Sequence, residues 1–222
     1  MNKVLVFAIH PDDETLGCGG SLLKHKANGD EVHWLIATHI FEELGFSKEV
    51  INKRNDEIKA VEALYDFDSV SNLMLKTTRC DEYAMSELIS KISAHIQRIQ
   101  PSIIYLPFKG DVHSDHRVCF DAIYACTKVF RYPYIKQLLM METLSETDFA
   151  LSTKEDSFSP NVFVDVSDYI DKKCEAMGIY ESEVGKHPFP RSFETIKALA
   201  KVRGAAAGVA YAESFMLLKE IR

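Results

Sequence analysis

Short apolar runs alternate with segments of helical period along most of the chain, and this alternation constrains the fold more than any other feature. Residues 4–9 form a continuous apolar run, typical of a central parallel strand that is buried on both faces. Further strands are predicted at 31–38, 69–75, 103–106, 135–141 and 162–166, and helices at 16–27, 47–64, 86–99, 118–130, 169–182 and 193–206. The alternation predicts an α/β fold with a mostly parallel sheet and helices on both faces.

The length of 222 residues suits one full-sized α/β domain, and we find no internal repeat or linker. We therefore expect a single domain over residues 1–222. The polar stretch 145–160 is predicted to be a surface loop near the functional site, and residues 215–218 form a short apolar tail.

The bulk composition narrows the set of partners and compartments. A formal charge of −7 disfavours nonspecific binding to nucleic acid. The five cysteines are scattered without a C-x-x-C pair, which favours reduced thiols in a cytoplasm. No apolar run of about 18 residues is present, so no membrane span is expected. We expect a cytoplasmic protein that binds a small molecule; the sequence leaves homo-oligomerisation open.

Two polar clusters follow two of the predicted strands. The run His10-Pro11-Asp12-Asp13-Glu14 comes directly after the first strand, and Asp111-Val112-His113-Ser114-Asp115-His116 follows the strand at 103–106. Ligands of open α/β sheets bind outside the carboxyl ends of the strands, so we expect the two clusters to meet there. Carboxylates gather against their mutual repulsion when a cation compensates them, and histidine with aspartate suits zinc. The clusters together predict one metal site.

Catalytic zinc sites use three protein ligands and leave a fourth position for water. His10, Asp13 and His116 would supply two nitrogen atoms and one oxygen. Asp12 would then remain beside the metal as a general base for the bound water.

The remaining polar residues of the second cluster would assist the reaction. His113 is expected opposite the base as an imidazolium that stabilises an oxyanion or protonates a leaving amine. Asp115 would orient His113 or balance its charge.

Each motif also has a simpler explanation when it is taken alone. His-Pro-Asp is commonly a turn, acidic residues complement the N-terminal dipole of a helix, and an isolated H-x-x-H is usually accidental. Their joint occurrence at two strand ends needs several coincidences, and it therefore favours the metal site.

These motifs also resemble a known family. His10-Pro11-Asp12-Asp13-Glu14, followed by Gly17-Cys18-Gly19-Gly20, is similar to the A-H-P-D-D-E…G-x-G-G opening of the LmbE-like (PIG-L) zinc de-N-acetylases, and His113-Ser114-Asp115-His116 resembles their H-x-D-H. Further similarities, in chain order, are Arg54-x-x-Glu57 with Ala60, Arg131-Tyr132-Pro133, Arg203-Gly204 through Gly208, and Tyr211-Ala212-Glu213-Ser214-Phe215. The resemblance covers nearly the whole chain. Ile9 departs from the alanine that is common before the histidine.

The resemblance implies a Rossmann-like fold and zinc-dependent hydrolysis of the N-acetyl group of an N-acetylglucosamine-type sugar conjugate. It implies one zinc ion per chain on His10, Asp13 and His116, with Asp12 as general base. It also implies transition-state assistance by His113.

Three further residues are candidates for substrate binding. The resemblance implies that Arg54 reaches the sugar, although its charged helix segment also fits a solvated face. Arg131 begins a turn before Pro133 and would serve as a bidentate anion clamp. His187 lies in a proline-bounded loop that would border the site, or would lie on the surface.

Two rival functions remain open. One is metal-assisted phosphoester hydrolysis, which usually uses two metal ions about 4 Å apart and more carboxylate ligands. The other is a sugar- or nucleotide-binding module with a decayed site. The sequence identifies neither the molecule that carries the sugar nor the ion, since iron or another divalent metal could replace zinc.

Overall fold

The computed structural model describes residues 1–151, 153 and 157–222. Its strands are β1 (Lys3–Ala8), β2 (Glu31–His39), β3 (Ser69–Lys76), β4 (Ile103–Leu106), β5 (Gln137–Met141), β6 (Val162–Asp165) and β7 (Ala212–Glu220). Its α-helices are α1 (Asp13–Ala27), α2 (Lys48–Tyr65), α3 (Met85–Ile99), α4 (Ser114–Ala125), α5 (Ile170–Ile179) and α6 (Phe193–Ala207). Three 3₁₀ turns are η1 (Glu42–Leu44), η2 (Cys80–Glu82) and η3 (Glu181–Glu183).

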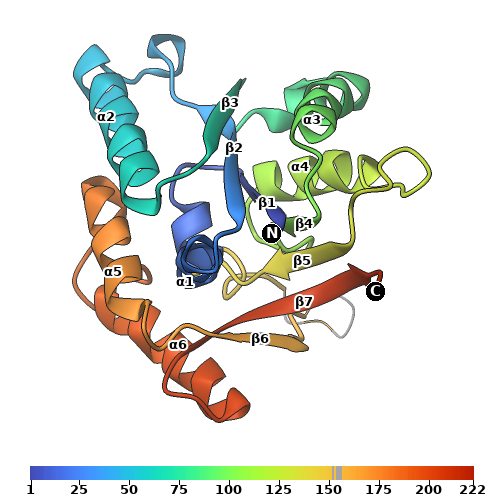
Figure 1. Cartoon of the computed structure of the whole chain (residues 1–222). Coiled ribbons are helices and arrows are strands. Elements are labelled where there is room, and N and C mark those ends of the chain that lie inside the picture. Colours follow the sequence, from blue (N-terminus) through green and yellow to red (C-terminus); the bar gives the residue numbers. More distant parts are fainter. Residues whose placement is uncertain (152, 154–156) are drawn as a thin grey trace.

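The strands form one sheet in the order β3-β2-β1-β4-β5-β7-β6 (Figure 1). The pairs β1–β2, β1–β4, β2–β3 and β4–β5 are parallel, and β7 runs antiparallel to both β5 and β6. This mixed but mostly parallel sheet confirms the predicted fold class. It also places the ends of β1 and β4 next to each other, because these two strands are neighbours.

Helices cover both faces of the sheet, as the strand pattern predicts (Figure 1). Helices α1, α2, α5 and α6 pack on one face, and α3 and α4 pack on the other. Alternate side chains along β1 divide between these two cores. Val4, Val6 and Ala8 lie in the first, and Leu5, Phe7 and Ile9, which directly follows the strand, lie in the second. After its exposed first residue, Lys3, the central strand is therefore apolar because both of its faces are covered.

The predicted elements agree with the structure except at a few boundaries. The helix predicted at 118–130 is α4, which begins at Ser114 and ends at Ala125. The apolar tail at 215–218 belongs to β7, which lies between β5 and β6 inside the sheet. Part of the loop predicted at 145–160, residues 152 and 154–156, lies outside the described residues.

Helix α1 approaches its neighbours closely because glycines replace side chains along it. A Cβ atom on Gly17 would lie 2.9 Å from Cβ of Met141, and one on Gly20 would lie 2.7 Å from Cβ of Val166. The helix also kinks at Cys18, where φ is −150°. Close packing of α1 thus fixes the turn that precedes it, which carries the first polar cluster.

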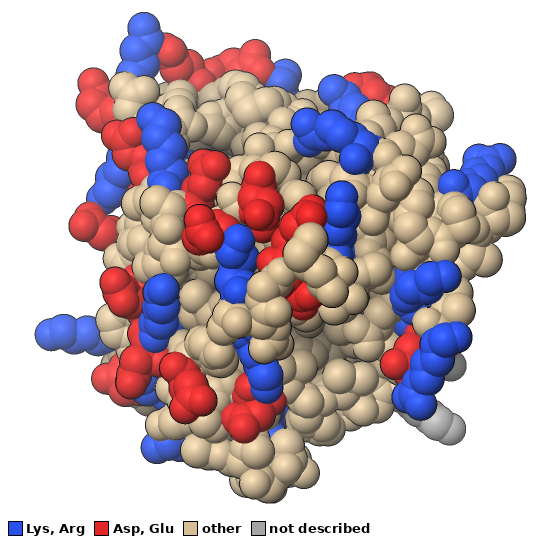
Figure 2. Space-filling model, in the orientation of Figure 1, with Lys and Arg blue, Asp and Glu red and all other residues tan. Residues whose placement is uncertain are grey.

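Acidic and basic side chains alternate over α2 and α5 on the face shown in Figure 2. One such pair joins α2 to η3, with Nζ of Lys53 2.7 Å from Oε2 of Glu181. Within the described part of the chain, no helix combines the length and apolar character needed to cross a membrane.

Candidate metal centre and substrate pocket

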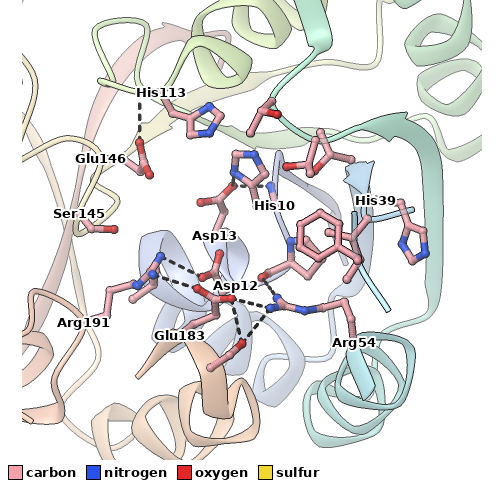
Figure 3. A pocket seen from close by; sticks show the side chains of 18 of the residues that line it. His10, Asp12, Asp13, His39, Arg54, His113, Ser145, Glu146, Glu183 and Arg191 are labelled. Atoms are coloured by element: carbon pink, nitrogen blue, oxygen red, sulfur yellow. Dashed lines mark hydrogen bonds and ion pairs between the residues drawn. The ribbon is translucent and has the colours of Figure 1, made fainter. Parts of the chain in front are cut away.

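The two polar clusters meet at the carboxyl ends of β1 and β4, as the sequence predicts. His10 lies two residues beyond β1, Asp13 begins α1, and His116 lies in the first turn of α4. Asp13 and His116 are buried, whereas His10 is partly exposed to a pocket of about 480 Å³. Figure 3 shows His10, Asp12 and Asp13 along the floor of this pocket.

Three donor atoms face one another across a small gap. Nε2 of His116 lies 3.3 Å from Oδ2 of Asp13 and 3.3 Å from Nδ1 of His10, and the third separation, from Nδ1 of His10 to Oδ2 of Asp13, is 3.9 Å. Tetrahedral zinc with bonds of 2.0–2.2 Å needs its donor atoms roughly 3.4 Å apart. The spacing and the chemistry of this donor set therefore fit a zinc-sized divalent ion.

In each histidine of this set, the ring nitrogen that does not face the gap lies close to a carboxylate. Nδ1 of His116 lies 2.8 Å from Oδ2 of Asp111. The other carboxylate oxygen of Asp111, Oδ1, accepts a hydrogen bond of 2.7 Å from Oγ1 of Thr147. Nε2 of His10 lies 3.2 Å from Oδ2 of Asp115. Such carboxylates fix the tautomer and the ring orientation of metal-binding histidines. They leave Nε2 of His116 and Nδ1 of His10 free to bind an ion.

Asp13 is held as a carboxylate by its surroundings. Its Oδ2 accepts hydrogen bonds from the backbone N–H groups of Ile9 and His10, at 2.9 and 2.8 Å. Burial opposes ionisation, but His116 and His10 together lower the pKa of Asp13. An ionised Asp13 is the state that binds a metal ion.

Asp12 lies between the donor set and a loop arginine. Its backbone has a φ of 132°, which is rare for a residue with a side chain, and its carboxylate is 3.5 Å from Nη1 of Arg191. Burial and then the charge of Asp13 raise the pKa of Asp12, and Arg191 opposes this shift. Glu14 accepts the Asp12 backbone N–H at 3.1 Å, and burial raises the pKa of Glu14 to about 7.

His113 lies at the pocket in a neutral form, which differs from the imidazolium that we expected. It caps α4, and its Nδ1 accepts a hydrogen bond of 3.1 Å from the backbone N–H of Asp115. An imidazolium has no lone pair for such a bond, so the ring carries its proton on Nε2. Burial and the charge of His10 lower the pKa of His113 to about 4.

Asp115 also has a different partner from the one we expected. Its Oδ2 lies 3.9 Å from Nδ1 of His113 but 3.2 Å from His10. It further accepts the backbone N–H groups of Thr78 and Cys80 at 2.6 and 3.0 Å. Asp115 therefore orients His10 and anchors the segment after β3.

The structure separates the three predicted substrate-binding residues. Arg54 lines the pocket, but it donates to the carbonyl of Pro11 at 3.1 Å and to Glu183 at 2.5 Å, and its Nε lies 3.2 Å from Glu57. Each of its three guanidinium nitrogens thus contacts a protein oxygen.

Arg131 and His187 are exposed and are not among the residues that line the pocket. Arg131 follows the far end of α4, a helix of 12 residues that spans about 18 Å. The helix therefore carries Arg131 away from the strand ends where the pocket lies.

Three pocket residues were missed by reasoning from the sequence. Arg191 and Glu183 form an ion pair at 2.9 Å, and Glu183 also binds Arg54, so a chain of charges runs beside Asp12 (Figure 3). Glu146 accepts the backbone N–H of His113 at 3.2 Å. The proline-bounded loop was a usable signal for Arg191, but the sequence analysis singled out His187 of that loop instead.

A family model gives the decisive comparison. The model of PIG-L, described as GlcNAc-PI de-N-acetylase, matches residues 5–127, more than half of the chain and both polar clusters. The chain belongs to the PIG-L family. This confirms the resemblance found in the sequence and relates the chain to enzymes that hydrolyse amide bonds.

Other relatives match the entire chain. A diacetylchitobiose deacetylase of Thermococcus kodakarensis is 26% identical over 241 residues, which cover 100% of this chain and 85% of that protein. The crystal structure of the conserved protein TT1542 from Thermus thermophilus is 26% identical with a TM-score of 0.79, covering 100% of this chain and 97% of the other.

A third comparison concerns the fold alone. GalB, the 4-carboxy-2-hydroxymuconate hydratase of Pseudomonas putida KT2440, has a TM-score of 0.75 at 18% identity and covers 100% of this chain and 98% of its own. Because a hydratase shares this fold, the reaction must be argued from the site.

Proposed function

We propose that this PIG-L protein is a zinc-dependent hydrolase that removes the N-acetyl group from an N-acetylglucosamine-type sugar conjugate. The observation that carries the proposal is the set of donor atoms from His10, Asp13 and His116, spaced as tetrahedral zinc requires at the floor of a pocket of about 480 Å³. The deacetylase activity named for the Thermococcus kodakarensis relative supports the choice of reaction.

When bound by His10, Asp13 and His116, zinc would supply Lewis acidity to the amide carbonyl and would make a water molecule easier to deprotonate. Asp12 takes the proton of the attacking water, since its carboxylate lines the same pocket beside Asp13. Arg191 supports this role, because its guanidinium favours the charged form of Asp12 and holds the side chain in place.

His113 assists on the other side of the donor set. Its Nε2–H is the ring's free donor, since Nδ1 accepts the Asp115 amide, and a neutral donor of this kind stabilises the oxyanion of a tetrahedral intermediate. Glu146 holds the backbone of His113 and lines the same pocket. The proton that Asp12 takes up can then pass to the departing amine.

A single ion fits the described residues better than the pair expected of a phosphoesterase. A second possible donor group, His10, His113 and Asp115, shares His10 with the first. In this second group, Nδ1 of His113 already accepts the backbone N–H of Asp115. This arrangement favours amide hydrolysis at one metal ion.

A panel assay tests the reaction. Purified protein is incubated with N-acetylglucosamine, its methyl β-glycoside, N,N′-diacetylchitobiose and p-nitrophenyl phosphate, with and without a chelator. We expect metal-dependent release of acetate from at least one of the sugars and no phosphate release. Phosphate release without acetate would instead support the phosphoesterase.

A further inference from the structure

His39 is a buried histidine at the substrate pocket that the proposed reaction does not use. It is the last residue of β2, the neighbour of β1, and its side chain lines the same pocket as His10 and Asp12. It is 6% exposed. Figure 3 places it on the Arg54 side of the pocket, away from Glu146 and Ser145.

The imidazole of His39 has an unsatisfied polar atom. Its Nδ1 is sealed from solvent and has no hydrogen-bond partner among the described residues. The rings of His39 and Phe41 meet edge to face with their centroids 5.2 Å apart. This contact orients the imidazole but gives neither nitrogen a hydrogen bond. Buried polar atoms are rarely left without a partner, and each exception calls for an explanation such as a functional role.

The neighbours of His39 indicate what kind of ligand group would complete it. Burial and then the charge of Arg54 lower the pKa of His39, so the ring is neutral and offers one donor and one acceptor nitrogen. A half-turn about the Cβ–Cγ bond exchanges Nδ1 with Cδ2 and Nε2 with Cε1, so either edge of the ring can carry a nitrogen toward the pocket. A hydroxyl group, which also donates and accepts, matches both forms.

Apolar side chains, three threonines (Thr38, Thr77 and Thr78) and the paired Arg54 line the pocket near His39. Ile40, Phe46 and Val50 are the apolar residues. The three guanidinium nitrogens of Arg54 contact Pro11, Glu57 and Glu183. This side therefore offers apolar contact, threonine side chains and one imidazole. No unpaired cation among the described lining residues would receive an anionic group.

We propose that His39 binds a hydroxyl group of the substrate, and that Ile40, Phe46 and Val50 pack against an uncharged part of the conjugate beyond the reacting acetamide. This inference rests on the proposed function, because it assigns part of the same pocket. It makes His39 a specificity-determining residue, distinct from the residues that activate water.

The test compares His39→Phe and His39→Gln with a matched control, His33→Phe. His33 lies on the same strand and is also buried, but it contacts Ser69 and does not line this pocket. We measure kcat and KM for N-acetylglucosamine, its methyl β-glycoside and N,N′-diacetylchitobiose. Isothermal titration of zinc-free protein with the same sugars gives Kd without turnover.

For the best of these substrates, we expect His39→Phe to lower kcat/KM about tenfold, mainly through KM, and to weaken Kd by a similar factor. His39→Gln should recover part of the loss, and His33→Phe should behave as wild type. Equal KM and Kd values in His39→Phe and wild type would overturn the assignment of His39.

The titration of zinc-free protein distinguishes failure of this proposal from failure of the proposed function. If wild-type protein releases no acetate, the function fails, and the Kd values alone decide the role of His39. A wild type that binds none of the three sugars would overturn both proposals.

Discussion

Asp12 combines an unusual backbone with a buried charge. Its φ of 132° is costly for a residue with a Cβ, of the order of 1–3 kcal/mol, and such strain collects at functional sites. The Glu14 carboxylate holds the Asp12 amide, and Arg191 holds its carboxylate. The surrounding contacts thus keep Asp12 in a position that local preference alone would not select.

Asp12→Asn tests the general base directly. The change keeps the shape of the side chain but removes the proton acceptor, so we expect kcat to fall by about 10²- to 10⁴-fold. Zinc content, measured by atomic absorption, should remain at the wild-type level because Asp12 is outside the donor set. Wild-type kcat in this variant would remove Asp12 from the reaction.

Asp111→Asn tests the carboxylate behind His116. Loss of the charge that fixes the His116 tautomer should weaken zinc affinity about 10- to 100-fold, as measured by competition with a chromophoric chelator. Asp121→Asn is a matched control, because Asp121 lies on α4 with its side chain 59% exposed. Equal zinc affinities in the two variants would contradict the role of Asp111.

The meeting of His10, Asp13 and His116 could be predicted from sequence, whereas most of the pocket wall could not. The motif of His10 and Asp13 directly follows β1, and that of His116 is in the connection from β4 to α4, so chain order places both at the same edge of the sheet. Arg191 and Glu146 come from loops and Glu183 from the short turn η3, and the positions of these segments depend on the packing of α5, α6 and β5. Residue type alone could not show which loop side chain points inward.

At the scale of single elements, the boundaries of a strongly periodic helix could be predicted within a residue or two. The boundaries and sheet position of a strand that is defined by long-range pairing could not. Helix α3 begins at Met85 and ends at Ile99, close to the predicted 86–99. Helix α4 begins four residues early because His113 caps it, and a polar first turn hides the apolar period. Strand β7 lies between β5 and β6, an order that no pattern along one strand encodes.

Gly20→Ala tests whether close packing of α1 supports the metal turn. The new Cβ would lie 2.7 Å from Cβ of Val166, so we expect the free energy of unfolding to fall by about 1–3 kcal/mol in urea titrations of zinc-free protein.

Gly178→Ala is the control for this overpacking. Gly178 lies in α5, and the nearest atom to its added Cβ is 3.4 Å away, an ordinary contact. This variant should be as stable as wild type or slightly more stable, because alanine favours a helix. Equal stability of Gly20→Ala and wild type would show that α1 can shift without cost.

At the scale of the whole molecule, one seven-stranded sheet carries every described strand, and we propose that residues 1–222 act as one domain. The donor residues are separated by about a hundred positions in sequence, and only the pairing of β1 with β4 brings them together. Formation of the sheet is therefore a precondition for the site, and the site links the two halves of the chain.

The most direct test of this account is a zinc titration of metal-free protein, followed by the rate of acetate release from the best sugar of the panel. We predict that the rate rises linearly with added zinc and levels off at one equivalent per chain, and that His116→Ala stays inactive throughout. A rate that is independent of zinc, or that levels off only at two equivalents, would contradict the single-ion site.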